Sequence, residues 1–343
     1  MPGMNDLNTP RRSAHWVNLV LLCASLAACG GGDEPGIDSA DASDSREEAL
    51  AVSAGNRGLT LPPPPPPGAT LELGIKIAGF PHKIDVYRPP GATRAIVFLH
   101  GNGGTPGSLA YLLGFSLTAY PSAKVVNWEW LNRNGVIAVL PQGQAAPGST
   151  VGTWSNYIAY SGQDDVAFLK SLATNVTSKY GVADVSLAGY SAGGVMSGRV
   201  WCEATASYKS YVSVAGPMMS GSGRGVTCTP PTTAPYFVMF GAKDTVIPTY
   251  NPNLPAPTPE QAAAGLTAGF LVAEWTRDSD RTRWVCGETT QLAGTTAAPV
   301  GPTWSNCSNR TRYSVVKNAD HTIPSFEAAT GSKMVDLIAG FTH

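Results

Sequence analysis

Short, continuous runs of apolar residues recur along the chain from residue 95 onward. Runs of this kind predict strands that are buried on both faces of a sheet. The predicted buried strands are Ala95–Leu99, Gly135–Leu140, Val185–Ala188, Tyr211–Ala215, Pro235–Phe240 and Arg312–Val316. Two earlier segments, Leu71–Ile77 and Lys83–Tyr87, predict an opening antiparallel pair.

Helical patterns lie between these strands. The clearest covers Gln163–Tyr180, where Phe168, Leu172 and Val176 form an apolar stripe and Gly181 marks the end. Asp164 and Asp165 fall in its first turn, where negative charge suits the helix dipole. Further helices are expected over Pro259–Thr276 and Phe326–Phe341, with irregular structure or a small hairpin over residues 287–311. Alternation of strands and helices predicts an α/β fold with a mostly parallel, doubly wound sheet, forming one catalytic domain over residues 69–343.

The pattern changes most abruptly around Ser191. An apolar strand runs into Gly189-Tyr-Ser-Ala-Gly193, and a helix of small residues follows. This is the context of the G-x-S-x-G nucleophile elbow, in which a tight, strained turn exposes the serine hydroxyl. Gly193 and Ser197 would let the helix lie close to the sheet. The alternative is an ordinary glycine-rich turn, so the prediction depends on whether partners for Ser191 exist.

A base and an acid follow the serine at the ends of later strands. The order Ser191, Asp244, His321 is that of the α/β-hydrolase fold. The other four histidines are His15 in the N-terminal segment, His82 and His100 before the elbow, and His343 at the terminus. Asp320 is the competing acid, but it adjoins His321, so its side chain would point away in an extended segment. Asp278 and Asp280 indicate solvated surface.

The first buried strand leads into His100-Gly101-Asn102, which resembles the loop that donates one oxyanion-hole N–H in α/β-hydrolases. We expect the N–H groups of Asn102 and Ala192 to form that hole, with His100 as a structural histidine. An ordinary strand-to-helix turn is the alternative. Together these residues predict a serine esterase that passes through an acyl-enzyme. Such chemistry needs neither a metal nor an organic cofactor.

The N-terminal segment predicts export. Arg11 and Arg12 precede the apolar stretch Val17–Ala27, which is too short to span a bilayer. Leu26-Ala-Ala-Cys29 resembles the bacterial lipoprotein box, so we expect residues 1–28 to be a signal peptide and Cys29 the lipid site. An ordinary cleaved signal is the alternative. Residues 29–68, ending in six prolines, predict a disordered tether and stiff spacer, rather than an SH3-type ligand.

Composition suits one large α/β domain and argues against nucleic-acid binding. The chain is 43% hydrophobic and 14% charged with a net charge of −1, and it lacks the basic patches that nucleic-acid binding requires. The mature domain retains Cys202, Cys228, Cys286 and Cys307, which allow three disulfide pairings. The local pairing Cys202–Cys228 and Cys286–Cys307 is favoured. Zinc is the competing use, but neither C-x-x-C nor H-E-x-x-H occurs.

Residues 69–343 resemble the polyhydroxybutyrate-depolymerase and feruloyl-esterase family of secreted α/β-hydrolases. The resemblance rests on the His100-Gly101 loop, Pro141-Gln-Gly143, Asp164-Asp-Val166, Trp201-Cys-Glu203 and the cysteine placement. The chain departs from the family at Asn102, where the family often has cysteine, and at Ile323, where its histidine motif usually has tryptophan. The resemblance implies hydrolysis of polyhydroxyalkanoate or of feruloyl and acetyl esters of polysaccharides.

Aromatic residues are the candidates for substrate contacts. Trp154, Tyr157, Tyr160, Tyr190 and Tyr250 could line an aromatic or polymer-binding cleft, or they could pack in the core. Two other functions stay open at this point. One is a serine peptidase, and the other is a non-catalytic surface lipoprotein that binds carbohydrate or polymer. In every case the membrane is contacted only through the lipid anchor.

Overall fold

A computed structural model describes residues 64–117, 125–145, 148–156, 164–217, 234–246, 290–291, 300–306, 311–316 and 318–342. All of these lie within one compact unit, Pro62–His343. The predicted helix over Pro259–Thr276 lies outside the described residues, as do the N-terminal segment and Cys29. Among the described residues, no helix combines the length and apolar character that crossing a membrane requires.

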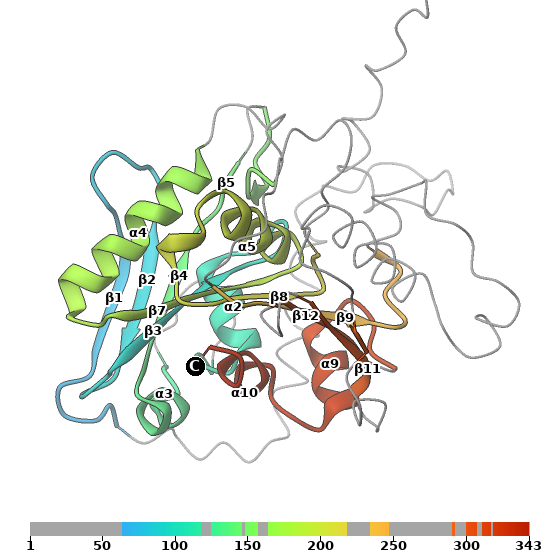
Figure 1. The fold of residues 1–343 in the computed structure, drawn as a ribbon. Helices are drawn as coiled ribbons and strands as arrows, with labels where there is room; N and C mark the ends of the chain where they lie inside the picture. The colour runs from blue at the N-terminus through green and yellow to red at the C-terminus, as the bar shows by residue number, and fades with distance from the viewer. Residues whose placement is uncertain are drawn as a thin grey trace, which may run out of the picture. The chain divides into compact units, whose positions relative to one another are not determined.

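The fold is built on a large central sheet (Figure 1). Its strand order is β1-β2-β4-β3-β7-β8-β9-β12-β11-β10. The bounds are β1 Thr70–Ile75, β2 Ile84–Arg88, β3 Arg94–Leu99, β4 Val136–Pro141, β7 Asp184–Tyr190, β8 Tyr211–Val214, β9 Tyr236–Gly241, β10 Thr290–Gln291, β11 Val300–Asn306 and β12 Thr311–Val316. A separate hairpin pairs β5 (Gln144–Ala145) with β6 (Gly152–Thr153).

The middle of the sheet is parallel, from β4 to β12. Its two margins are antiparallel: β1 pairs with β2 and β2 with β4, while β11 pairs with β12 and β10 with β11. The mostly parallel sheet and the opening antiparallel pair are therefore confirmed. The hairpin considered for residues 287–311 corresponds to β10 and β11, which extend the sheet beyond β12.

Helices cover both faces of the sheet (Figure 1). On one face lie α4 (Asp165–Tyr180) and α5 (Ala192–Glu203), and on the other α2 (Pro106–Leu112), α3 (Trp128–Asn134), α9 (Ile323–Thr330) and α10 (Met334–Ala339). A short 3₁₀ turn, Thr205–Ser207, follows α5. Alternate residues of each strand face opposite sides, which divides the core in two. Val97 packs with α4 and α5, whereas Phe98 packs with the helices of the other face.

The single helix expected over Phe326–Phe341 is wrong. The segment forms α9 and α10, and α9 ends at Gly331. Gly331 has a φ of 67°, the left-handed conformation that terminates helices and that glycine adopts without strain. By contrast, α4 follows the prediction closely: the Asp164 carboxylate accepts the N–H of Ala167 at 2.9 Å, and Gly181 closes the helix with a φ of 70°.

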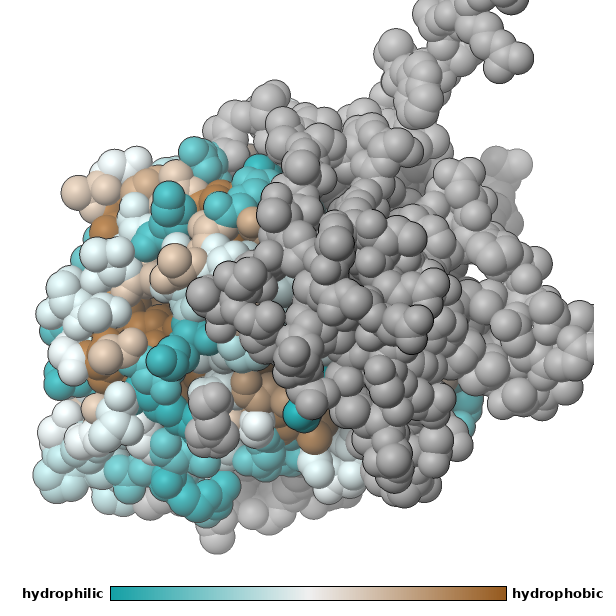
Figure 2. Space-filling view, viewed as in Figure 1, coloured by the Kyte–Doolittle hydropathy of each residue, from teal (hydrophilic) through white to brown (hydrophobic). Residues whose placement is uncertain are grey.

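The surface on the side of α4 mixes hydrophilic and hydrophobic residues (Figure 2). A few large apolar side chains are exposed, including Leu73, Leu112 and Val151. Exposed apolar side chains are normal on the surface of globular proteins.

Candidate active site

Ser191 occupies the sharp turn between β7 and α5. Its φ of 54° and ψ of −120° belong to a backbone region that residues with a side chain rarely adopt. Close packing explains the flanking glycines. A Cβ atom on Gly189 would lie 2.0 Å from the carbonyl oxygen of Gly193, and one on Gly193 would lie 2.3 Å from that of Leu99. The Gly-x-Ser-x-Gly sequence is therefore a steric requirement of this turn.

Ser191, His321 and Asp244 form one hydrogen-bonded row. The Nε2 atom of His321 lies 2.8 Å from the Oγ atom of Ser191, and its Nδ1 atom lies 2.7 Å from Oδ2 of Asp244. Because a carboxylate only accepts hydrogen bonds, Nδ1 carries the proton and donates a hydrogen bond to Oδ2 of Asp244. Nε2 is then free to accept the proton of the Ser191 hydroxyl. Three residues far apart in sequence thus meet in the arrangement needed to activate a serine.

Neighbouring parallel strands bring the acid and the base together. Asp244 follows β9, His321 follows β12, and the carboxyl ends of these adjacent strands meet at one edge of the sheet. Backbone hydrogen bonds from Ala242 to Val316 and from Lys243 to Ala319 tie the two connecting loops to each other. The sheet therefore fixes the separation of Asp244 and His321.

Asp244 and His321 differ in burial and in their other hydrogen bonds. Asp244 is fully buried, and its second oxygen, Oδ1, accepts the N–H of Val246 at 2.8 Å. The His321 side chain keeps 13% of its surface exposed. Asp320, the competing acid, is exposed and instead accepts two hydrogen bonds from Thr322. Burial with both oxygens paired holds the Asp244 carboxylate in one orientation toward the imidazole.

The loop that carries Asn102 lies against the serine. A Cβ atom on Gly101 would lie 3.3 Å from the Cβ atom of Ser191, so only glycine allows this approach without displacement. Asn102, the next residue, is exposed. On the other side of Ser191, Ala192 is the first residue of α5, and the first N–H groups of a helix have no partner within it. Both N–H groups predicted for an oxyanion hole thus belong to segments that adjoin Ser191.

A buried histidine anchors that loop. The Nδ1 atom of His100 donates to the carbonyl oxygen of Gly101 at 2.7 Å, and Nε2 accepts the N–H of Gly143 at 2.9 Å. Burial lowers the pKa of His100 to about 4, which keeps the ring neutral and able to accept. His100 is a structural residue, as the sequence predicted.

Sequence comparison identifies the family of this chain. A profile of the alpha/beta hydrolase family matches residues 96–337, which span all three members of the hydrogen-bonded row. The chain belongs to the alpha/beta hydrolase family. No curated protein matches it in a direct sequence search.

Solved structures that resemble this hydrolase include three enzymes. An acetyl xylan esterase from Aspergillus awamori is 16% identical, with a TM-score of 0.49, and the alignment covers 74% of this chain and 95% of that one. For an arylesterase the values are 10% identity, a TM-score of 0.47, and 88% and 90% coverage. A dienelactone hydrolase from Anabaena variabilis has 13% identity, a TM-score of 0.43, and 80% and 95% coverage.

The aromatic residues suggested as substrate contacts have other roles where the hydrolase structure describes them. Trp154 is only 1% exposed, and its indole Nε1–H donates to the carbonyl oxygen of His100 at 2.9 Å. It is a core residue, which corrects the expectation of a substrate contact. The hydroxyl of Tyr190 donates to the carbonyl oxygen of His321 at 2.9 Å. Tyr157, Tyr160 and Tyr250 lie outside the described residues.

A second histidine–aspartate pair takes no part in the hydrogen-bonded row, and sequence reasoning missed it. Nε2 of His82 lies 2.8 Å from Oδ1 of Asp165, both side chains are buried, and the imidazole stacks on Phe168 at 3.8 Å. The other oxygen of Asp165 accepts the N–H of Ser155 at 2.6 Å. The pair joins the β1–β2 connection to the start of α4, so its role in the hydrolase is structural.

Cys202 is disulfide-bonded. Its partner lies outside the described residues, as do Cys228, Cys286 and Cys307, so the pairing stays a prediction. Within the described part of the chain, no group of three His, Cys, Asp or Glu residues is arranged to hold a metal ion.

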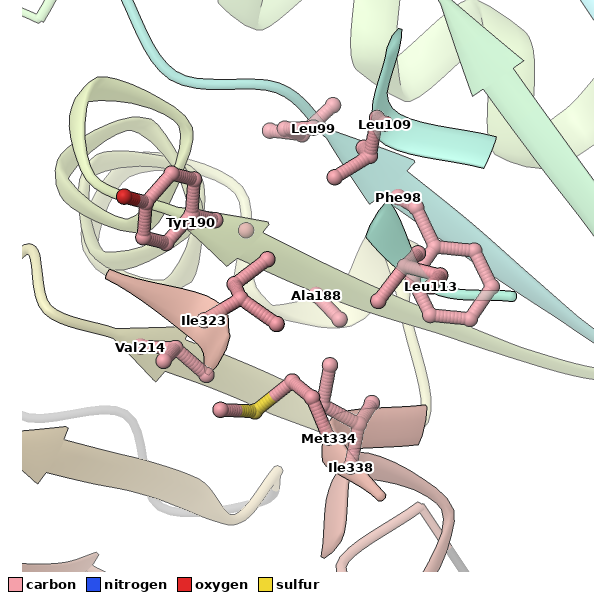
Figure 3. A pocket seen from close by; sticks show the side chains of 11 residues that line it. Phe98, Leu99, Leu109, Leu113, Ala188, Tyr190, Val214, Ile323, Met334 and Ile338 are labelled. Carbon is pink, nitrogen blue, oxygen red and sulfur yellow. The ribbon is translucent and has the colours of Figure 1, made fainter. Parts of the chain in front are cut away.

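A small apolar cavity of about 10 Å³ lies beneath the elbow (Figure 3). Side chains from β3, β7 and β8 and from α2, α9 and α10 line it, among them Phe98, Leu113, Ala188 and Met334. A space of this size holds about one water molecule. It is a gap in the packing of the core rather than a site for an ester.

Proposed function

We propose that this hydrolase is a serine esterase that cleaves carboxylic esters through an acyl-enzyme. The observation that carries the proposal is the hydrogen-bonded row Ser191–His321–Asp244, with distances of 2.8 and 2.7 Å. A serine hydroxyl is a weak nucleophile at neutral pH unless a base takes its proton as it attacks. The row meets at the strained turn that presents Ser191, and the His321 side chain stays partly exposed there, so its location favours catalysis over a purely structural role.

The proposed reaction has two halves. In the first, His321 takes the proton of Ser191 while the hydroxyl oxygen attacks the ester carbonyl, and Asp244 stabilises the resulting imidazolium. The N–H groups of Ala192 and Asn102 hold the negative charge on the former carbonyl oxygen. His321 then protonates the leaving alcohol as the C–O bond breaks. In the second half, His321 takes a proton from water as the water attacks the acyl group, and returns it to the Oγ atom of Ser191 as the carboxylic acid leaves.

We propose polyester, or feruloyl and acetyl esters of polysaccharides, as the substrate class. The support is the resemblance of the motifs around His100, Asp164 and Cys202 to secreted depolymerases and feruloyl esterases. Peptides are the second class to test, because the same serine, histidine and aspartate arrangement can cleave amides.

We also propose that the enzyme is exported and that Cys29 carries a lipid. The support is the sequence Leu26-Ala-Ala-Cys29 after an apolar stretch, together with the long polar and proline-rich segment before residue 69. Metabolic labelling with a fatty-acid analogue in a bacterial host should mark the wild type and leave C29S unmarked. Equal labelling of both would contradict the lipid site.

Ester turnover tests the central proposal. We expect the purified protein to hydrolyse short-chain p-nitrophenyl esters, and S191A to lose at least about 10³-fold in kcat. Clearing of a polyhydroxybutyrate film, release of ferulate from methyl ferulate and release of acetate from acetylated xylan then separate the substrate classes. Turnover of a fluorogenic peptide panel with no ester turnover would indicate a peptidase. Failure of a fluorophosphonate to label Ser191 in the folded protein would indicate a binding protein without catalysis.

A further inference from the structure

Tyr190 links the serine to the base through the backbone. It is the last residue of β7 and directly precedes Ser191. Its hydroxyl donates a hydrogen bond to the carbonyl oxygen of His321 at 2.9 Å, and its ring lies 5.6 Å from the imidazole, centre to centre. The side chain beside the nucleophile thus contacts both the backbone and the ring of the base.

The Tyr190 side chain is half-buried. A Cβ atom on Gly101 would lie 3.4 Å from the tyrosine ring, so the loop that carries Asn102 closes one side. The ring also borders the apolar cavity, and its hydroxyl points away from that cavity (Figure 3). Burial raises the pKa of Tyr190 to about 12, so the phenol keeps its proton and donates at every pH at which the enzyme would work.

The base needs such an anchor because of where it lies. His321 belongs to the loop between β12 and α9, and loops are held less rigidly than strands. Its side chain must keep Nε2 at 2.8 Å from Ser191 and Nδ1 at 2.7 Å from Asp244 at once. A hydrogen bond from the end of β7 to its carbonyl oxygen ties the loop to the same strand that presents the serine.

We propose that Tyr190 is a positioning residue that sets the distance between His321 and Ser191. The inference rests on the proposed esterase function. It replaces the substrate contact suggested by the sequence, because the tyrosine hydroxyl donates its hydrogen bond to His321 and the half-buried ring lies against the Gly101 loop. Tyr190 therefore acts on every substrate alike, through the activation of Ser191.

The test compares two tyrosine-to-phenylalanine variants of the full chain. Y190F removes the hydrogen bond to His321 and keeps the ring. Y208F is the matched control, because the buried Tyr208 hydroxyl also donates to a backbone carbonyl, that of Leu169 at 2.7 Å, and takes no part in the hydrogen-bonded row. Both variants lose one tyrosine-to-carbonyl hydrogen bond, so a general loss of stability should be similar in the two.

We expect Y190F to lower kcat about 3- to 10-fold with KM nearly unchanged, the effect of one lost hydrogen bond on the active geometry. The loss should be the same for acetyl, butyryl and feruloyl esters and for the rate of labelling by a fluorophosphonate, while Y208F keeps the wild-type rates. A loss confined to some esters, or carried by KM, would make Tyr190 a substrate contact and overturn the proposal. Wild-type kcat and labelling in Y190F would also overturn it.

Two further variants separate the possible failures. Y190M removes the ring and the hydroxyl together, and its kcat should fall at least as far as that of Y190F. A kcat equal to that of wild type in Y190M would contradict the positioning role, even where Y190F folds poorly. S191A reports on the proposed function itself. If wild type and S191A are equally inactive, the esterase proposal fails. If wild type is active and S191A is not, only the behaviour of Tyr190 is at issue.

Discussion

Oδ2 of Asp244 lies 2.7 Å from Nδ1 of His321, inside a core that leaves the carboxylate no contact with solvent. The other oxygen of Asp244 accepts the N–H of Val246. A carboxylate held in this way fixes which ring nitrogen carries the proton, and that choice decides whether the imidazole can act on Ser191.

Replacing Asp244 by asparagine should therefore abolish most activity while keeping the size and shape of the side chain. In D244N the amide can donate to Nδ1, which favours the tautomer with its proton on Nε2, facing Ser191. We expect kcat to fall by about 10⁴-fold. Steady-state kinetics on a p-nitrophenyl ester measures the loss.

D320N is the control for D244N. Asp320 also adjoins His321 in the chain, but it is exposed and bonded to Thr322. Its substitution should change kcat by less than about 3-fold. A larger loss in D320N than in D244N would make Asp320 the catalytic acid.

The backbone of Ser191 stores strain that a second substitution can release. Its φ of 54° and ψ of −120° suit glycine, whereas alanine keeps the Cβ atom that causes the conflict. We expect S191G to be inactive but more stable than S191A by about 1 kcal/mol in the free energy of unfolding. Urea unfolding of the two variants gives the difference.

A glycine substitution in unstrained backbone should lower the free energy of unfolding instead of raising it. Ala328 is exposed within α9, where glycine costs about 1 kcal/mol relative to alanine. A328G should therefore be less stable than wild type. The free energy of unfolding should rise from S191A to S191G and fall from wild type to A328G. A fall of the same size in both comparisons would show that the turn at Ser191 is not strained.

The sequence predicts the central part of this fold because its signals are local. Continuous apolar runs identify β3, β4 and β9, and glycine identifies the end of α4. The row of Ser191, Asp244 and His321 is also predictable, since each follows a buried strand in the order typical of the fold. The split between α9 and α10 was missed because Gly331 interrupts an otherwise helical pattern by its left-handed backbone alone.

Long-range side-chain pairs are the part that sequence reasoning could not reach. Asp164 and Asp165 look equivalent at the start of a helix, yet one is an exposed cap and the other is fully buried against His82. The sequence left Trp154 open as either a cleft residue or a core residue, and its indole is buried and donates to the carbonyl oxygen of His100. Such roles depend on which distant segment packs against the residue, and no local pattern encodes that.

His100 makes the stability of the fold depend on pH. Burial lowers its pKa from 6.5 to about 4, so as the pH falls through this window the unfolded chain takes up a proton that the folded chain does not. Its contribution to stability is therefore fully present above about pH 6.5 and is lost as the pH falls toward 4. Between about pH 7 and pH 5 the loss amounts to about 2 kcal/mol.

H100Q removes this titration. The variant should be less stable than wild type near neutral pH, because the acceptor for the Gly143 N–H is disturbed. Its free energy of unfolding should nevertheless fall by about 2 kcal/mol less than that of wild type between about pH 7 and pH 5. Denaturant titrations at both pH values provide the comparison, and parallel pH slopes in the two proteins would refute the role assigned to His100.

The buried pair of His82 and Asp165 should be a major determinant of stability. Replacing Asp165 by alanine leaves a buried imidazole and the N–H of Ser155 without their acceptor, since the two carboxylate oxygens serve one each. Removing one partner of a buried pair typically costs about 3–5 kcal/mol.

D164A is the matched control, because Asp164 only caps α4 at its exposed end, which is worth about 1 kcal/mol. Urea denaturation should rank D165A well below D164A, while both keep the wild-type KM in whatever fraction remains folded. Equal destabilisation by the two neighbouring substitutions would show that the pair of His82 and Asp165 adds nothing beyond the helix cap.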